Sequence, residues 1–469
     1  MTTSMGLRHV GVIGLGPMGT NLALNLINTG HHVVLHNRTR GRTEEVLALA
    51  ARPDAATGAA SLSGLVASLP RPRTVVVLVA PPGTQEVLDM LCPLLDAGDT
   101  VVDGGNSSHE DTERRQAGFA HRGVGLLGAG IASGVDGAHC GLSATVGGDP
   151  RVYTATRPMF EAIAASVDGE PCCVYAGAGG AGHYVKTIHN GVEYAQMQLV
   201  AETVTWLRAS TGLAPADLAC ELAGWNSELR SYVVRTAIDA LARVDGETGA
   251  PYLDVIDDRA VQNGSGRRAA ASALDLEVAS TAFSEASFAW YLSCDRQLRA
   301  AATAHPTPRH HGIPSARDAL DTARHALAAS LLVVHAQAHR QLAAAVERRG
   351  TADPAAILHS WRAACIRSSS LDLVHWTAGT RDVPVLGAPE VVRETARHTG
   401  GWRAFVADAV TRGIAVPCTA AVLAYLDGAR TTRSSGAVVQ ALRSRLGGNA
   451  HGRVDRPGSF RTDWTETQA

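Results

Sequence analysis

Short apolar runs separated by helix-length segments make up the first part of the chain. The runs occupy residues 10–13, 32–36, 74–80, 100–102, 124–127 and 143–146. Runs of this length, bounded by glycine and polar residues, are typical of buried strands. Because helix-length segments lie between them, the strands are predicted to form a mainly parallel sheet in an α/β domain.

The pattern changes at about residue 182, where long segments rich in Ala, Leu, Arg and Glu replace the strand-like runs. Breaks at residues 212–215, 246–251, 304–314, 350–354 and 384–389 divide this part into helices. Past residue 433 the chain is rich in Gly and Arg, with Phe460 and Trp464 as possible anchors. We predict an α/β dinucleotide-binding (Rossmann-type) domain over 1–181, an all-helical domain over 182–432 and an extended tail over 433–469.

The first apolar run leads into a glycine turn that contains Gly14, Gly16, Met18 and Gly19, followed by a helix-like segment and a second apolar run. This strand–turn–helix–strand order is that of a dinucleotide-binding unit, in which glycines allow close approach of the backbone and the helix N-terminus holds a pyrophosphate. The sequence therefore predicts a nicotinamide dinucleotide cofactor.

The residues at the end of the second apolar run indicate which dinucleotide the chain binds. An NAD enzyme usually carries an acidic residue there, whereas this chain has Asn37, Arg38 and Thr39, with Arg42 close by. A guanidinium beside hydroxyl and amide donors suits a 2′-phosphate, so NADP is favoured. The alternative is that both arginines are ordinary surface residues.

Two glycine-rich loops follow later strands of the predicted sheet. One spans residues 103–107 and holds Asn106, and the other spans residues 128–134 and holds Ser133 and Gly134. Cofactor and substrate meet at such loops in open α/β sheets. Asn106, Ser133 and Gly134 are therefore candidate binding residues, although they are also common in plain turns.

Lys186 is the only lysine among 42 Lys and Arg residues. Arginine stays protonated at working pH, whereas a lysine in a partly dry pocket can lose its proton and act as a base. His189, Asn190, Glu193 and Tyr194 follow at helical spacing, which places them on one face with Lys186. We interpret Lys186 as a candidate for proton transfer; chance survival on a solvated face is the alternative.

Bulk properties exclude several classes of protein. A formal net charge of -2 and a pI of about 6.8 give no footprint for nucleic acid or an anionic membrane. The eight cysteines contain no C-x-x-C pair, so neither a metal site nor a disulfide framework is predicted. No apolar run has the length of a membrane span, and no signal peptide is evident. A globular, cytoplasmic protein is expected.

The motifs together resemble the 6-phosphogluconate dehydrogenase family of decarboxylating NADP enzymes from end to end. They comprise the glycine turn, the Asn37–Thr39 triplet, DGGNS at 103–107, EPCC at 170–173, GAGHYVKTIHNGVEYAQMQ at 180–198, W-R-x-x-C-I at 361–366, IAVPC at 414–418 and RPG at 456–458. The resemblance implies a homodimer in which the tail of one subunit enters the active site of the other.

The resemblance also implies roles for the candidate residues. Lys186 would take a proton from the substrate's C3 hydroxyl and later act as an acid during loss of carbon dioxide. Glu193 would protonate the enediol carbon, while His189, Asn190 and Asn106 would orient the sugar acid. An acid and a base two turns apart on one helix can address opposite ends of a three-carbon unit.

The chain departs from the family where the substrate phosphate is held. The substrate loop reads Ala132-Ser133-Gly134 instead of Ser-Gly-Gly, and Asn263 stands where the family has lysine, before Gly264 and Ser265. Trp290 aligns with a family arginine and Asn449 with a family histidine, whereas Arg443 matches. Tyr194 and Ser265 keep their hydroxyls, and Arg267 and Arg268 could restore some charge.

These departures lead to the hypothesis of an oxidative decarboxylase whose sugar acid substrate lacks the 6-phosphate or carries an altered tail. Ordinary turnover of 6-phosphogluconate with a redrawn phosphate site remains an open alternative. Two further alternatives are a 3-hydroxy acid dehydrogenase that does not decarboxylate and a non-catalytic NADP-binding relative.

Overall fold

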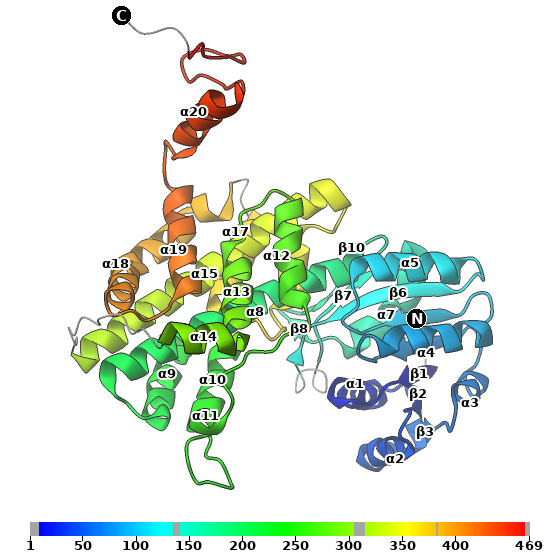
Figure 1. Cartoon of the computed structure of the whole chain (residues 1–469). Coiled ribbons are helices and arrows are strands. Elements are labelled where there is room, and N and C mark those ends of the chain that lie inside the picture. Colours follow the sequence, from blue (N-terminus) through cyan, green and yellow to red (C-terminus); the bar gives the residue numbers. More distant parts are fainter. Residues whose placement is uncertain (1–8, 135–140, 304–314, 381–382, 465–469) are drawn as a thin grey trace, which may run out of the picture. The chain divides into compact units, whose positions relative to one another are not determined.

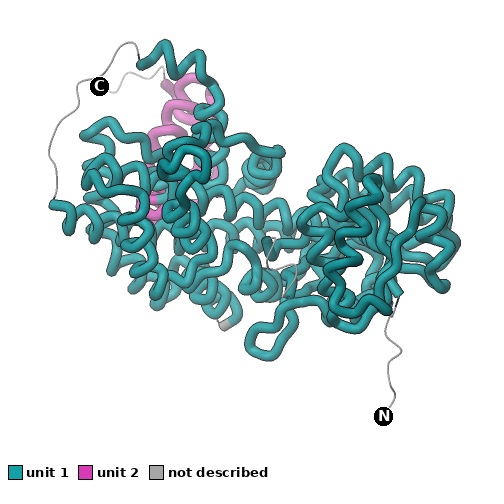
Figure 2. Tube along the Cα trace, turned by 90° about the horizontal axis from the view of Figure 1, so that it is seen from below, with its two compact units in different colours: residues 1–422 teal, residues 423–469 magenta. Residues whose placement is uncertain are grey.

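The computed structural model describes residues 9–134, 141–303, 315–380 and 383–464. The predicted break at 304–314 lies outside these ranges. Contacts divide the chain into two compact units, residues 1–422 and 423–469, which Figure 2 colours separately. The predicted domain boundaries after residues 181 and 432 are not tested by this division and stay predictions.

The N-terminal part of the first unit contains an eight-stranded sheet in the order β10-β7-β6-β5-β4-β1-β2-β3 (Figure 1). Its strands are β1 His9–Ile13, β2 His32–His36, β3 Ala56–Gly58, β4 Thr74–Val77, β5 Thr100–Asp103, β6 Gly125–Ile131, β7 Ala144–Gly147 and β10 Cys173–Gly177. All pairs are parallel except β6–β7, which confirms the mainly parallel sheet. The hairpin β8 Ser166–Val167 and β9 Glu170–Pro171 lies apart from it.

All six apolar runs of this region form strands, and their side chains are buried because helices cover the sheet. Two sheet strands were missed. β3 has only three residues, and β10 is only half-buried, so neither has a long apolar run. The helices of this part are α1 Pro17–Asn28, α2 Arg40–Leu49, α3 Leu62–Ala67, α4 Gly83–Leu91, α5 His109–Ala120 and α7 Pro150–Ile163.

Helices make up the rest of the first unit, as the sequence predicts, so the fold class is confirmed. They are α8 Ala181–Thr211, α9 Pro215–Leu229, α10 Tyr232–Ala242, α11 Tyr252–Val255, α12 Ser265–Asp275, α13 Thr281–Cys294, α14 Arg296–Thr303, α15 Ala316–Arg349, α16 Pro354–Trp361, α17 Ser369–Thr380, α18 Pro389–Thr411 and α19 Pro417–Ala429, which runs into the second unit. None of the described helices is long and apolar enough to cross a bilayer. The cytoplasmic location stays a prediction.

Helix α8 joins the sheet to the helical part. Its first turns pack on β6 and β7, and further along it contacts α12, α13 and α15. Glycines form the contact surface at its start: a Cβ on Gly182 would lie 2.2 Å from the carbonyl oxygen of Gly128, and one on Gly130 would lie 2.5 Å from Lys186 Cβ. These contacts hold α8 flat against the carboxyl-terminal half of the sheet, and we call them the glycine seam.

The second unit contains α20 Gly436–Gly447 and an irregular segment after it. A β-bridge joins His451 to Phe460, and the Arg456 guanidinium lies over the Phe460 ring. Trp464 Nε1 donates to Ser444 Oγ at 3.2 Å. The tail therefore has local structure of its own, with both predicted aromatic anchors in contacts within it.

Candidate active site

The glycine turn has the geometry of a phosphate cradle. Gly14 has φ +91°, and a Cβ there would meet the backbone of Leu78 at 2.5 Å, so only glycine fits. Gly16 instead faces open space, and α1 begins after it with no side-chain cap on its N–H groups. Free amides at a helix N-terminus beside an open glycine suit the pyrophosphate of a dinucleotide.

At the end of β2 the four predicted cofactor residues divide into two groups. Asn37 Oδ1 accepts from the Leu15 N–H at 3.0 Å, and Arg42 Nε donates to the Leu15 carbonyl at 2.8 Å while its Nη1 donates to Glu45. These two residues brace the glycine turn. Arg38 and Thr39 are exposed beside it, so Arg38 is the cation that remains for a ligand.

Asn106 follows β5 on a loop that is held by a buried ion pair. Asp103 accepts from Arg115 Nη1 at 2.9 Å and from Ser107 Oγ at 2.8 Å, and both Asp103 and Arg115 are buried. A buried pair with additional hydrogen bonds fixes its surroundings firmly. The loop therefore presents Asn106 as an exposed side chain at the carboxyl edge of the sheet.

Ser133, beyond β6, is fully buried, and its Oγ accepts from the Ser143 N–H at 2.6 Å. This bond ties the two strand ends together and lends no support to the predicted contact between Ser133 and a substrate. Gly134 follows with φ +71°, and the nearest atom to a Cβ there is the Tyr232 hydroxyl at 3.2 Å. Its backbone is thus a left-handed turn next to α10.

Lys186 lies on α8 next to the glycine seam, 9% exposed. Its Nζ is 3.3 Å from His189 Nδ1, and the same ring nitrogen is 3.4 Å from Asn190 Oδ1 and 3.9 Å from Glu193 Oε2. The structure therefore brings the four predicted catalytic residues together on one face of α8. Glu193 is the most exposed of them, at 30% of its side chain.

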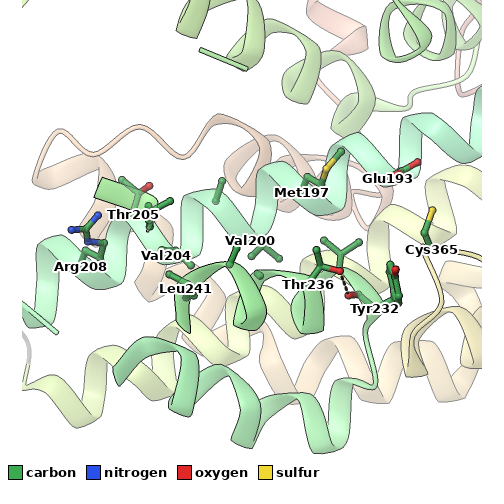
Figure 3. A pocket seen from close by; sticks show the side chains of 15 residues that line it. Glu193, Met197, Val200, Val204, Thr205, Arg208, Tyr232, Thr236, Leu241 and Cys365 are labelled. Carbon is green, nitrogen blue, oxygen red and sulfur yellow. Dashed lines mark hydrogen bonds between the residues drawn. The ribbon is translucent and has the colours of Figure 1, made fainter. Parts of the chain in front are cut away.

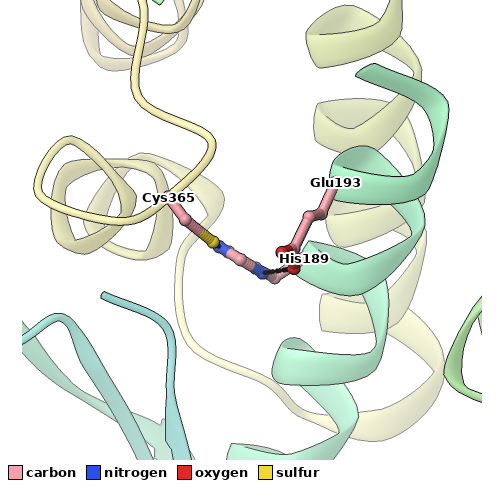
Figure 4. A group of neighbouring side chains, drawn as sticks. All are labelled: His189, Glu193 and Cys365. Carbon is pink, nitrogen blue, oxygen red and sulfur yellow. Dashed lines mark hydrogen bonds and ion pairs between the residues drawn. The ribbon is translucent and has the colours of Figure 1, made fainter. Parts of the chain in front are cut away.

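The His189 ring is held on several sides. It is fully buried and meets the edge of Trp361 with ring centroids 5.6 Å apart. Burial, with Lys186 as a second cause, holds the pKa of His189 well below its usual value, so the ring is neutral. Figure 4 shows it between Glu193 and Cys365, whose Sγ lies 3.8 Å from Nε2.

His189, Glu193 and Cys365 offer donor atoms that lie within 4.8 Å of one another. The carboxylate faces Nδ1 of the ring, whereas the thiol faces Nε2. Burial raises the pKa of the Cys365 thiol, which keeps its proton, so we interpret the group as a hydrogen-bonded cluster and not as a set of metal ligands.

Beyond Glu193, a cluster of neutral side chains forms around Tyr194; we call it the distal cluster (Tyr194, Asn263, Ser265 and Trp290). Asn263 Oδ1 accepts from the Tyr194 hydroxyl at 3.3 Å and from Ser265 Oγ at 2.9 Å. The Trp290 ring stacks on Tyr194 with centroids 4.3 Å apart, and its Nε1 donates to Gln198. None of these contacts involves a charged group.

Glu193 and Cys365 also border an apolar cavity of about 520 Å³ between α8 and α10 (Figure 3). Its walls are formed mainly by Met197, Val200, Val204, Val233, Ala237 and Leu241. The candidate acid is thereby in contact with apolar surface on one side.

Comparisons with known proteins fit this geometry. Residues 182–464 match the 6-phosphogluconate dehydrogenase C-terminal domain, and residues 9–177 match the NAD binding domain of 6-phosphogluconate dehydrogenase. The chain belongs to the 6-phosphogluconate dehydrogenase family. Membership of this family identifies the chain as a nucleotide-dependent oxidoreductase.

Relatives in this family use either nucleotide. A decarboxylating 6-phosphogluconate dehydrogenase from Bacillus licheniformis is 37% identical, covering 97% of this chain and 99% of its own. Bacillus subtilis has an NAD-dependent relative at 37% identity (97% of this chain, 99% of its own) and an NADP-dependent one at 34% (98% and 100%). A Plasmodium falciparum 6-phosphogluconate dehydrogenase, solved alone, with NADP and with 6-phosphogluconate, superimposes with TM-score 0.89 at 27% identity (97% and 100%).

Of the predicted replacements for the missing phosphate-binding charges, Arg268 lies beside the distal cluster, with its Nη1 3.6 Å from the position that a Cβ on Gly264 would take. Arg267 is exposed, and Arg268 lines a small cavity with His109 and Arg349. Among the described residues, no hydrogen bond joins either arginine to the distal cluster. Arg443 is exposed in the second unit, where its carbonyl accepts from Asn449 Nδ2 at 3.1 Å.

The sequence places Trp290 at the substrate-phosphate site by alignment but does not predict its stacking on Tyr194. Cys365 lies in a motif of the family, yet the sequence assigns it no role, although it touches His189 from 176 positions away. No local pattern signals either contact, because both join elements distant in sequence.

Proposed function

We propose that the enzyme catalyses NADP-dependent oxidative decarboxylation of a 3-hydroxy sugar acid that lacks the 6-phosphate. The observation that carries the proposal is the neutral distal cluster. Family membership supplies the reaction class, and the cluster narrows the substrate.

Proton transfer begins at Lys186. As an unprotonated amine it takes the proton of the C3 hydroxyl while hydride leaves C3. The bound NADP supplies the nicotinamide ring that accepts this hydride. The resulting 3-keto acid breaks its bond to the carboxyl carbon, and the Lys186 ammonium returns the proton to the developing enolate oxygen.

Glu193 completes the reaction by protonating the enediol carbon while the Lys186 amine takes back the proton of the adjacent enediol hydroxyl, which gives a ketose. It stands two turns from Lys186 on α8, so the base and the acid reach different carbons of the substrate. Asn190 and the exposed Asn106 orient the sugar acid, while the buried His189 positions Lys186.

The distal cluster discriminates against a phosphate. A phosphate ester carries a charge of about −1.5 to −2, and charged hydrogen bonds contribute roughly 1.5–3 kcal/mol each. The Tyr194, Asn263 and Ser265 groups are neutral and would by themselves leave that charge poorly compensated. Their hydroxyl and amide groups match the terminal hydroxyls of an unphosphorylated sugar acid, and Trp290 can pack against its carbon chain.

NADP is the proposed nucleotide because β2 ends without an acidic residue and Arg38 is exposed beside the cradle. An acidic residue at this place would bind the ribose hydroxyls of NAD. A guanidinium there binds a 2′-phosphate instead.

The proposed oligomer is a homodimer with exchanged tails. Helix α20 exposes Val438, Val439, Leu442 and Leu446, of which Leu446 is 85% exposed. In the first unit, Leu274, Phe288, Tyr291 and Leu292 on α12 and α13 are exposed as well. Exposed apolar patches of this kind mark association surfaces, and a second copy of the chain would cover both.

The test is an assay of the purified enzyme with NADP and with matched substrates, gluconate and 6-phosphogluconate, recording both NADPH and carbon dioxide. We expect higher kcat/KM for unphosphorylated sugar acids. A strong preference for 6-phosphogluconate would refute the proposed substrate. NADPH formed without carbon dioxide would identify a simple dehydrogenase, and NADP binding without turnover of any sugar acid would identify a non-catalytic relative.

A matched pair of variants strengthens the assay. The double substitution Asn263→Lys with Trp290→Arg puts two cations into the distal cluster and should raise kcat/KM for 6-phosphogluconate by on the order of a hundredfold. Arg296→Ala, which removes an exposed charge outside the cluster, is the control and should change neither substrate's kinetics.

A further inference from the structure

The thiol of Cys365 reaches the catalytic helix from the segment between α16 and α17. Its own N–H donates to the Ala132 carbonyl at 2.8 Å, which anchors this segment to the end of β6. The side chain is buried, and its Sγ lies 3.8 Å from Nε2 of His189. The thiol is therefore held beside the ring nitrogen that faces away from Lys186.

The thiol is a hydrogen-bond donor throughout the working pH range. Burial, with the Glu193 carboxylate as a second cause, raises the pKa of Cys365 to about 12, so it keeps its proton. A neutral imidazole carries one hydrogen, on either nitrogen, and the partner of one nitrogen decides the state of the other. An S–H that donates to Nε2 leaves the hydrogen on Nδ1.

Nδ1 is the nitrogen that meets Lys186, at 3.3 Å. A donor N–H there can be accepted by the lone pair of an unprotonated amine, whereas it opposes the N–H groups of an ammonium. Asn190 Oδ1, at 3.4 Å from Nδ1, can accept the same hydrogen, whereas Glu193 Oε2 lies 3.9 Å away. The titratable groups around the pair are Glu193 on α8, His335 on α15 and Cys365 itself.

We propose that Cys365 is a positioning residue: its thiol fixes the hydrogen of His189 on Nδ1 and thereby favours the unprotonated amine of Lys186. The inference rests on the proposed role of Lys186 as the base. It gives the cysteine of the segment between α16 and α17 a task in proton transfer without contact to the substrate.

Because Lys186 is the only lysine, its protonation can be read directly. Isotopically labelled lysine in the full-length protein gives a single side-chain NMR signal, which is followed against pH in the presence of NADP. Cys365→Val, which removes the donor, should raise the midpoint of this titration by about one pH unit, the shift that one hydrogen bond supports. Cys365→Ser keeps a donor and should leave the midpoint close to that of the wild type.

The acid limb of the kcat/KM profile should move with the NMR midpoint in Cys365→Val and stay in place in Cys365→Ser. Cys172→Val, which removes another buried thiol, one that donates to the His359 carbonyl, is the control. If valine prevents folding, Cys365→Ala replaces it. An unchanged midpoint in the folded no-donor variant overturns the proposal, as does a shift confined to the alkaline limb, which would show that the thiol serves Glu193.

The NMR titration needs no substrate. A failure to turn over unphosphorylated sugar acids would therefore refute the proposed substrate and leave this result standing. An unchanged lysine midpoint would refute the role of Cys365 and leave the substrate assay standing.

Discussion

At the scale of single residues, Lys186 is the position on which the proposed chemistry depends. Lys186→Arg keeps the positive charge but removes exchange of the proton, because arginine does not deprotonate at working pH. We expect kcat to fall by on the order of 10²–10⁴, the usual contribution of a general acid–base group. Steady-state assays measure this fall.

The control measurements on Lys186→Arg are NADP binding and the stability of the fold. NADP affinity and the unfolding midpoint should stay near those of the wild type, since Lys186 does not line the glycine turn. Near-normal turnover in Lys186→Arg would rule out the base.

Arg38 is the residue on which the choice of nucleotide depends. Arg38→Ala should raise the KM for NADP by roughly 10–100-fold through loss of charged hydrogen bonds to the 2′-phosphate, with little effect on NAD. Arg40→Ala is the matched control, because Arg40 is paired with Glu44 at 3.1 Å on the solvent face of α2. Equal effects of Arg38→Ala on both nucleotides would contradict the assignment.

Residues on one helix were predictable, because helical spacing alone places Lys186, His189 and Glu193 on one face. Cys365 and Trp290 were not, because their contacts depend on how distant elements pack. Arg42 shows a third case: its sequence position suggests a ligand contact, yet its guanidinium braces the glycine turn. Local patterns identify the chemistry of a group, and tertiary packing decides which partner it finds.

At the scale of elements, the packing of α8 against α15 contains a buried imidazole that makes stability depend on pH. His335 Nε2 lies 2.9 Å from Gln196 Nε2 and 3.1 Å from Ser368 Oγ. Complete burial lowers the pKa of His335 to about 3. The unfolded chain, with an ordinary histidine, therefore takes up a proton first as pH falls.

The free energy of unfolding should thus decrease below about pH 6.5, by about 1.4 kcal/mol per unit from this residue. Urea denaturation at pH 7.5 and pH 5 measures the decrease. His335→Gln, which does not titrate, should lose about 2 kcal/mol less than the wild type between these values. An equal loss in both proteins would show that His335 is already protonated in the folded state.

The strands were also predictable at this scale where apolar runs are long enough, as in β1, β2 and β4. β3 and β10 were missed because a strand of three residues, or one only half-buried, has too little apolar pattern. The helix-rich character of the later part followed from composition, since Ala, Leu, Arg and Glu favour helices.

At the scale of the whole molecule, the proposed exchange of tails predicts complementation between two inactive chains. One chain carries Lys186→Met with an intact tail, and the other keeps Lys186 but lacks residues 433–469. Co-expression should restore roughly a quarter of wild-type activity, because half of randomly assorted dimers are mixed and each holds one complete site. Each chain alone should be inactive.

Size-exclusion chromatography is the companion measurement, with the full-length protein eluting as a dimer. Full activity of the tail-deleted chain by itself would exclude a tail contribution to the site. If a sample shown to contain mixed dimers recovers no activity, the proposed exchange of tails is likewise excluded.

The glycine seam limits how this enzyme could have diverged. At Gly130 and Gly182 the backbones of the sheet and the catalytic helix lie closer than any side chain allows, so even alanine would push α8 and its reactive groups out of place. Substitutions in the glycine seam are therefore hardly tolerated during evolution. In the distal cluster, Asn263 is exposed just before α12 and Trp290 is half-buried on α13. A lineage that acquires a new substrate is thus free to change there while it inherits the chemistry unaltered.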